Sequence, residues 1–150
     1  MHIQEITSGD FLYQLALELR YQLFFAEFGF PKEVTCDDLE DSSRHFVIAK
    51  SHSLIAYARL TELEPKRFKI SQVVVETDEQ HKGYGSSLVN NLVKCAVKAD
   101  AELIELNSQV TANSFYNQLG FNETGDTYQA QLTGIHHIRM VLDPLRQQEI

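Results

Sequence analysis

Cysteine is scarce in this sequence of 150 residues, occurring only as Cys36 and Cys95, without the paired spacing of a zinc site or a redox motif. We therefore expect the two cysteines to be free thiols, as in a reducing cytoplasm. The six histidines show no ligand spacing either, so we expect no bound metal. No segment approaches the roughly 18 apolar residues of a membrane helix, and the first residues, MHIQEITSGD, are neither basic nor apolar. We therefore expect a cytoplasmic protein without a membrane anchor.

Basic residues are also few, since 13 Lys and Arg stand against 21 Asp and Glu, and the formal net charge is −8. They are scattered along the chain instead of forming a stripe, so nucleic acid is not an expected partner. An acidic surface suits a cationic or amine-bearing substrate, and it is equally what a merely soluble protein shows.

The length and the hydrophobic content of 43% suit one domain that spans residues 1–150, with residues 143–150 as a loose tail. No internal repeat, low-complexity tract or linker divides the chain. Nothing in the sequence distinguishes a monomer from a homodimer.

Hydrophobic periodicity predicts helices and strands that alternate along the chain. In order they are a helix at residues 11–28, a hairpin of strands at 46–49 and 54–60, a strand at 70–75, a helix beginning near residue 85, a strand at 103–106, a helix at 112–119, and a final hairpin at 127–142 that turns at Thr133 and Gly134. This order predicts a single core in an α/β fold.

The segment at residues 31–44 carries proline and five acidic side chains without a sustained period, which predicts a surface loop. Two interpretations of its carboxylates stay open. They can line a rim that attracts amines, or they can simply be solvated; the residues concerned are Asp37, Asp38, Glu40 and Asp41.

The segment VVVETDEQHKGYGSSLV runs from a β-branched strand through a polar bend into an amphipathic helix. Glycine at positions 83 and 85 lets the backbone turn tightly and approach a ligand, and the first amides of the following helix lack intrahelical partners. The helix dipole favours a phosphate at this end, and Lys82 can add a full positive charge. The pattern predicts an anion site, although a tight turn that binds nothing explains the spacing alone equally well.

Two common phosphate loops are missing from this segment. A dinucleotide fingerprint requires a third glycine where this sequence has Leu88, and the Walker pattern of Gly-Lys-Ser/Thr is absent. The segment instead resembles the coenzyme A loop of the GNAT acetyltransferase superfamily, Gln/Arg-x-x-Gly-x-Gly/Ala, which Gln80 to Gly85 fits throughout.

A second segment resembles the same superfamily, whose pattern there is Asn-x-x-Ala-x-x-x-Tyr-x-x-x-Gly-Phe. Here the matching positions are Gln109, Ala112, Tyr116, Gly120 and Phe121, with glutamine in place of the commoner asparagine. Further short matches are similar to the ElaA-like branch: Leu19-Arg20 with Phe24 and Glu27, Asp38-Leu39-Glu40 before His45, Ala56 to Leu60, Ser108-Gln109, Phe115-Tyr116 and His137 to Met140.

The resemblance implies a twisted, mostly antiparallel sheet with a splayed strand pair, flanked by helices. It further implies that acetyl-CoA is the co-substrate and that an amine attacks its thioester directly. The residues that it assigns to the coenzyme are Val73, Val74, Val75, Gln80, His81, Lys82, Gly83, Tyr84, Gly85, Ser86, Ser87, Gln109, Ala112, Phe115 and Tyr116.

Three residues are candidates for the chemistry. Tyr116 matches the family's general acid, and a phenol stays protonated at neutral pH while it can hydrogen-bond to sulfur. Glu27 and His137 are the candidates for taking a proton from the substrate ammonium. Without the family, each of the three is better explained by packing or solvent exposure.

The expected function is an N-acetyltransferase acting on a primary amine of a small molecule or a peptide. An alternative from another class is a sensor or interaction module that binds acyl-CoA without turning it over. Thioester consumption in the presence of amines separates the two.

Overall fold

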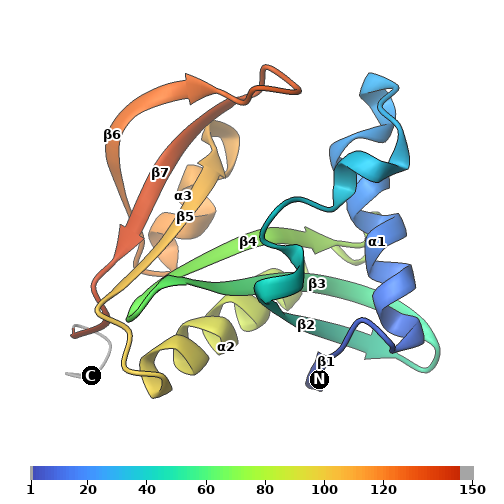
Figure 1. The fold of residues 1–150 in the computed structure, drawn as a ribbon, viewed down its shortest axis with the longest axis horizontal. Coiled ribbons are helices and arrows are strands. Elements are labelled where there is room, and N and C mark those ends of the chain that lie inside the picture. Colours follow the sequence, from blue (N-terminus) through green and yellow to red (C-terminus); the bar gives the residue numbers. More distant parts are fainter. Residues whose placement is uncertain (1, 146–150) are drawn as a thin grey trace.

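The computed structural model describes residues 2–145, which form one seven-stranded sheet with three α-helices (Figure 1). The elements are β1 (Ile3–Ile6), α1 (Phe11–Phe24), β2 (Ser43–Lys50), β3 (Ser53–Glu64), β4 (Arg67–Val75), α2 (Tyr84–Lys98), β5 (Leu103–Gln109), α3 (Asn113–Gln118), β6 (Asn122–Gln129) and β7 (His136–Leu142). The strand order is β1-β2-β3-β4-β5-β7-β6, and only the β4–β5 pair is parallel. The mostly antiparallel sheet expected from the sequence is confirmed.

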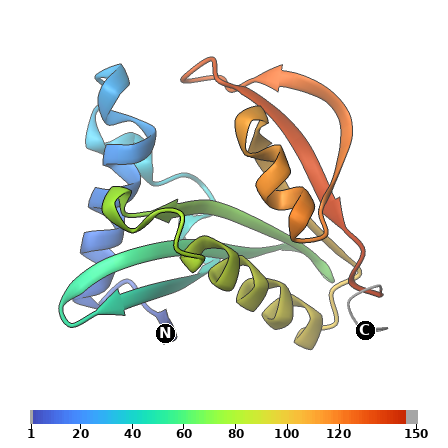
Figure 2. The same cartoon turned by 180° about the vertical axis from the view of Figure 1, so that it is seen from behind.

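The central strands are buried on both faces because helices cover each side of the sheet (Figures 1 and 2). Alternate residues of β2 and β3 belong to different cores, as strand geometry requires. Phe46 and Ala58 pack with Leu88 and Leu92 of α2, whereas Val47 and Tyr57 pack in the cluster that α1 covers. These two cores fix the helices on opposite faces.

Helix α1 begins where Asp10 caps it, with the carboxylate accepting a hydrogen bond from the amide of Leu12 at 2.9 Å. It ends at Phe24, four residues before the predicted end near Phe28. Residues 26–28 instead form a 3₁₀ turn that Gly29 closes with a φ of +73°. This early end turns the Phe24 and Phe25 side chains toward the centre of the molecule.

Other boundaries also differ from the sequence prediction. Strand β1 was not predicted, because four residues are too few to show a period. Strand β6 begins at Asn122, five positions before the predicted start of the hairpin, and its sequence NETGDTYQ has no apolar alternation because most of it is exposed. Thr133 and Gly134 lie in the β6–β7 connection, as predicted.

The predicted tail falls partly on residues 146–150, which lie outside the described residues. Cys36 and Cys95 are free thiols, as expected. None of the helices within residues 2–145 is long and apolar enough to cross a membrane.

Candidate functional site

A bulge in β4 shapes the centre of the sheet. Tyr57 of β3 faces Val74 and Arg59 faces Ser71, so Gln72 and Val73 together oppose the single residue Ala58. Gln72 has a φ of +57°, a left-handed conformation that is uncommon for a residue other than glycine. The extra residue bends β4 away from its other neighbour, β5.

The parallel pairing between β4 and β5 is therefore short. Only Arg67, Phe68 and Lys69 pair with β5, although β4 continues to Val75 and β5 to Gln109. Beyond this point the two strands diverge, as Figure 1 shows between the green β4 and the yellow-orange β5. The edge of β4 that faces the gap keeps backbone N–H and C=O groups without a strand partner, so they are available to a ligand.

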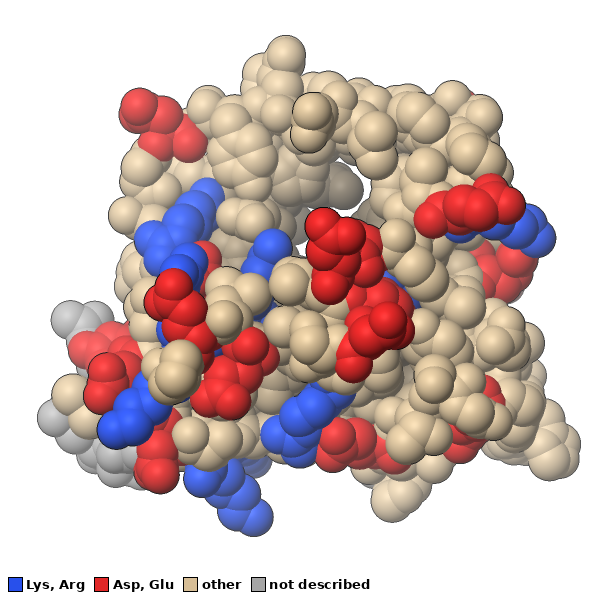
Figure 3. Space-filling view, viewed as in Figure 1, with Lys and Arg blue, Asp and Glu red and all other residues tan. Residues whose placement is uncertain are grey.

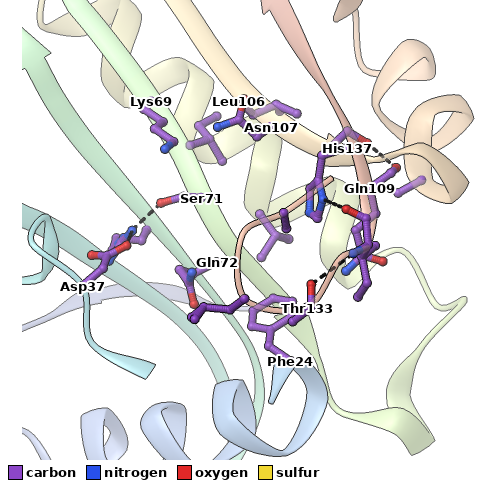
Figure 4. A pocket seen from close by; sticks show the side chains of 18 of the residues that line it. Phe24, Asp37, Lys69, Ser71, Gln72, Leu106, Asn107, Gln109, Thr133 and His137 are labelled. Carbon is purple, nitrogen blue, oxygen red and sulfur yellow. Dashed lines mark hydrogen bonds and ion pairs between the residues drawn. The ribbon is translucent and has the colours of Figure 1, made fainter. Parts of the chain in front are cut away.

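A cavity of about 800 Å³ lies in this gap, and Figure 3 shows its mouth as a hollow in the surface. Residues of β4 and β5 line it on one side, and Phe24 and Phe25 from the end of α1 on another. Residues 130–135 of the β6–β7 connection also line it. Figure 4 shows Lys69 and Asn107 on one side of the view and Phe24 and Thr133 on the opposite side.

The glycine turn, residues 80–87, connects the end of β4 to α2. Gly83 is the N-terminal cap of α2 with a φ of +88°, and His81 has a φ of +65°. Within residues 2–145, the backbone amides of residues 81–86 have no hydrogen-bond acceptor, whereas the amide of Ser87 donates to the Gly83 carbonyl at 3.1 Å. The turn thus presents a row of free donors at the positive end of the α2 dipole.

The two glycines of this turn differ in how strictly the structure requires them. A Cβ on Gly83 would meet nothing within 4 Å, so its positive φ alone favours glycine. A Cβ on Gly85 would lie 3.4 Å from the Phe115 ring and 3.5 Å from Val75 Cγ2. These are ordinary contact distances, so an alanine would also fit at position 85 between β4 and α3.

The predicted coenzyme-binding side chains of the turn differ in their contacts. Gln80 donates from Nε2 to the Val75 carbonyl at 3.1 Å, which ties the turn to the end of β4. Lys82 is exposed and forms an ion pair with Glu79 at 3.0 Å. His81 is exposed, and Tyr84, Ser86 and Ser87 are half-buried at the start of α2.

The second predicted segment meets the cavity from the side of β5 and α3. Gln109, Ala112 and Tyr116 line the cavity, and Phe115 packs edge-on against Tyr116 with ring centroids 4.9 Å apart. The side chain of Val73 also lines the cavity, while that of Val74 is buried in the core beneath α1. Only the backbone of Val74 can therefore contact a ligand in the gap.

Tyr116 combines burial with an accessible hydroxyl. Desolvation raises the pKa of its phenol to about 12, so the side chain is protonated throughout the neutral range. Among the described residues, the hydroxyl has no hydrogen-bond partner, and the side chain lines the cavity. It is therefore a free donor inside the gap.

The two candidate bases are placed differently. His137 of β7 lines the cavity, and its Nδ1 lies 2.8 Å from the Ile135 carbonyl oxygen. A carbonyl only accepts, so Nδ1 carries the hydrogen, and Nε2 of the neutral ring is left as the proton acceptor. Glu27 is exposed in the turn after α1 and does not line the cavity.

Glu40 fits neither interpretation of the acidic loop because it is buried, whereas Asp37 is exposed and lines the cavity while it also pairs with Arg59. Glu40 is 5% exposed and accepts two hydrogen bonds of 2.8 Å from Arg20, which is itself fully buried. Arg59 donates to Glu40 at 2.9 Å and to both oxygens of Asp37 at 2.8 and 2.9 Å. The tertiary fold thus converts two loop acids into partners of buried arginines.

Burial opposes the ionisation of Glu40, but hydrogen bonds from Arg20 and Tyr13 and the nearby charges outweigh it and lower the pKa to about 2. Desolvation lowers the pKa of the neighbouring His45, whose Nδ1 lies 2.6 Å from the Tyr57 hydroxyl. This buried network reaches the bulge, because Arg20 Nε donates to Gln72 Oε1 at 3.2 Å and Arg59 Nε donates to Ser71 Oγ at 3.0 Å.

Sequence reasoning missed several residues that line the cavity. On β4 the polar Arg67, Lys69 and Ser71 alternate with the buried Phe68 and Ile70, a period of two that assigns the polar set to one face. That pattern, RFKIS, is a signal that could have found them. The aromatic pair Phe24 and Phe25 carried no such signal, because their position depends on where α1 ends.

Comparisons with known proteins agree with this geometry. The family model of the acetyltransferase (GNAT) domain matches residues 20–144. Protein ElaA of Escherichia coli strain K12 is 28% identical to this chain over 152 residues, which cover 97% of this chain and 95% of that protein.

Two solved structures show the same fold. The crystal structure of Escherichia coli ElaA matches with a TM-score of 0.77 and 27% identity, covering 95% of this chain and 100% of the other. A GNAT family acetyltransferase from Elizabethkingia anophelis with acetyl-CoA bound matches with a TM-score of 0.73 and 16% identity, over 95% and 97% of the chains. At 16% identity the second likeness concerns the fold alone.

Proposed function

This chain is an ElaA-like member of the GNAT acetyltransferase family, and on that basis we propose that it transfers the acetyl group of acetyl-CoA directly to a primary amine of a small molecule. The observation that carries the proposal is the position of the glycine turn. Its free amides follow the end of β4, the strand that has separated from β5 and that lines the cavity as far as Val73. A phosphate-bearing donor and an acceptor can thus meet in one gap.

The coenzyme is expected to bind along β4. Its pyrophosphate accepts hydrogen bonds from the amides of the glycine turn, and Lys82 adds a charge if it leaves Glu79. The pantetheine arm is expected to run along Val73 to Val75 and to pair, as an added strand would, with those of their backbone groups that bond neither β3 nor Gln80. On the opposite side of the gap, Gln109, Ala112 and Phe115 complete the channel.

Tyr116 is proposed to assist the departing sulfur. A thiol has an ordinary pKa near 8.5, well below the value of about 12 for Tyr116, so the phenol remains protonated and donates a hydrogen bond to the thiolate as it forms. The proton that finally neutralises the sulfur is drawn from the attacking amine. A backbone amide near Val75 is proposed to stabilise the oxyanion.

His137 is our leading candidate for accepting a proton from the substrate ammonium. Its Nδ1 contact leaves Nε2 as the acceptor, and the ring stacks on Tyr128 with centroids 5.9 Å apart, which holds its orientation. Glu27 stays a weaker candidate for holding the ammonium, because it is exposed and does not line the cavity.

A small molecule is the favoured acceptor. The volume of about 800 Å³ falls within the ordinary range of small-molecule pockets, and Figure 3 shows its mouth as a hollow in one face. An acceptor in the form of a protein tail would instead require an open trough across the sheet.

The test is the Tyr116→Phe variant, assayed for thiol release from acetyl-CoA over pooled amines and for acetyl-CoA binding by calorimetry. We expect kcat to fall roughly a hundredfold while the Kd for acetyl-CoA changes less than about twofold. Tyr21→Phe removes a hydroxyl that binds the Phe30 carbonyl away from the cavity, and serves as the control. Equal losses in turnover and binding would contradict the role of Tyr116, and coenzyme binding without any thiol release would favour the acyl-CoA sensor.

A further inference from the structure

Lys69 is a cation that faces the cavity without an ion pair. It lines the gap from β4, and no carboxylate within residues 2–145 lies within ion-pair distance of its Nζ. Its strand partner on β5 is Glu105, but the oxygens of that carboxylate accept hydrogen bonds from Arg67 and Arg139. The nearest acid of the sheet is therefore already occupied by two arginines.

The loop acids near Lys69 are occupied in the same way. Both oxygens of Asp37 bind Arg59, and Glu40 binds Arg20 and Arg59. The charges of Arg20 and Arg59 are thus balanced by Asp37 and Glu40. Among the described residues of this face, Lys69 therefore has no acidic partner, although the formal net charge of the protein is −8.

An unpaired ammonium in this position is energetically unfavourable for the protein by itself. Lys69 is half-buried, and desolvation followed by the charge of Arg59 lowers the pKa of its ammonium, although Asp37 and Glu105 oppose this. Buried charges in proteins are normally paired, and Lys69 is partly removed from water. A negatively charged ligand group in the cavity would supply the missing partner.

Two neutral donors lie beside this cation. Ser71 is two residues from Lys69 on the same face of β4, and its Oγ accepts from Arg59 Nε, which leaves the hydroxyl proton to donate. Asn107 is two residues beyond Glu105 on β5 and also lines the cavity. Figure 4 shows Lys69 and Asn107 on the same side of the view, with Ser71 directed toward the Arg59 network.

We infer that the acceptor carries a carboxylate, bound by Lys69 with the Ser71 hydroxyl and the Asn107 amide. One ammonium with two neutral donors suits a single negative charge. The inference rests on the proposed function, since it places the reacting amine at the opposite end of the same molecule, near Val73 and Tyr116.

The length of β4 between these two ends restricts the substrate class. Lys69 lies four positions before Val73, and at about 3.3 Å per residue their Cα atoms lie up to roughly 13 Å apart. In an α-amino group the nitrogen is only two bonds from the carboxyl carbon. The substrate class is thus an amino carboxylate whose reacting primary amine is several bonds away, at the end of a chain.

The test compares aminohexanoate with hexylamine, a pair that differs by the carboxylate, on the full chain loaded with CoA so that no reaction occurs. By calorimetry, wild type is expected to bind aminohexanoate at least about tenfold more tightly than hexylamine. In Lys69→Met this preference is expected to fall to about twofold or less. Lys94→Met, which removes an exposed lysine of α2, should keep the wild-type preference.

Lys69→Met removes an unpaired half-buried charge, so its melting temperature should equal or exceed that of wild type, and Lys69→Gln provides a second variant. Equal affinity for the two ligands in wild type, or an unchanged preference in both Lys69 variants, overturns the inference. Turnover with acetyl-CoA is measured separately. If the Lys69-dependent preference is present and no amine releases thiol, the carboxylate site stands and the proposed acetyl transfer fails.

Discussion

At the residue scale, the coenzyme site depends most on Gly83. Its φ of +88° lies in the region that favours glycine, and the space around it is open, so a side chain there meets strain without a clash. The strain would act where the free amides of the glycine turn converge. Gly125 of β6 has a φ of +77° with equally open space, far from this turn in the sequence.

Gly83→Ala is therefore expected to weaken acetyl-CoA binding several-fold, because the amide directions change as the backbone relaxes. Gly83→Ala and Gly125→Ala should each lower the free energy of unfolding by about 1 kcal/mol, since both place a Cβ on a left-handed residue. Urea unfolding measures the stability and calorimetry the affinity. A similar loss of affinity in Gly125→Ala would show that general destabilisation, and not the turn, is responsible.

At the scale of elements, β4 is the strand on which the site is built, and its bulge is held from α1 and β3. Arg20 binds the side chain of Gln72 and Arg59 that of Ser71, while Glu40 joins the two arginines. A left-handed residue such as Gln72 persists only when its surroundings determine its conformation. The buried network thus maintains the separation of β4 from β5.

Arg20→Met should lower the free energy of unfolding by about 3 kcal/mol, because it leaves Glu40 and the Thr35 carbonyl buried without this partner. The matched control is Arg44→Met, which breaks a bidentate pair with Glu5 whose side chains are 44% and 45% exposed. That change should cost less than about 1 kcal/mol in the same urea titration. Comparable losses would mean that the Arg20 network does not stabilise the fold more than a surface pair.

At the scale of the whole molecule, two parts of the sheet meet across only three residue pairs of β4 and β5. A charged network centred on Glu40 lies on one side of that junction, and a second one, centred on Glu105, spans it because Arg67 is on β4 and Arg139 on β7. Burial opposes the ionisation of both carboxylates, but their arginine partners outweigh it and lower both pKa values. Protonation of these carboxylates therefore weakens both the network beside the junction and the one across it.

Stability should accordingly fall with decreasing pH. The folded-state pKa of Glu40, about 2, lies below its ordinary 4.5, so its contribution of roughly 3 kcal/mol is present above about pH 4.5 and is lost as the pH falls toward 2. The lowered pKa of buried His45 acts in the same direction from about pH 6.5. Urea midpoints measured between about pH 7 and pH 3 test this, and Glu40→Gln should show a shallower dependence. If the stability of Glu40→Gln depended on pH as that of wild type does, Glu40 would not contribute to the pH dependence.

Much of the fold follows from local patterns. Leu88, Leu92 and Ala96 recur at helical spacing and form the buried face of α2, while Val73 to Val75 end a strand as their β-branched side chains predict. The end of α1 and the start of β6 were misplaced, because Phe25 continues an apolar helical pattern and Asn122 begins a strand without one. Boundaries of this kind depend on what each residue contacts.

The glycine turn was determined by the sequence alone, because a positive φ at Gly83 and the free amides of a helix start are set by adjacent residues. Only the tertiary structure decided which charges are paired. Arg20 meets Glu40 across 20 positions and Gln72 across 52. Among the described residues Lys69 has no ion-pair partner, because Glu105 binds two arginines from other strands. Such contacts depend on strand register and on the bulge at Gln72, which no local pattern encodes.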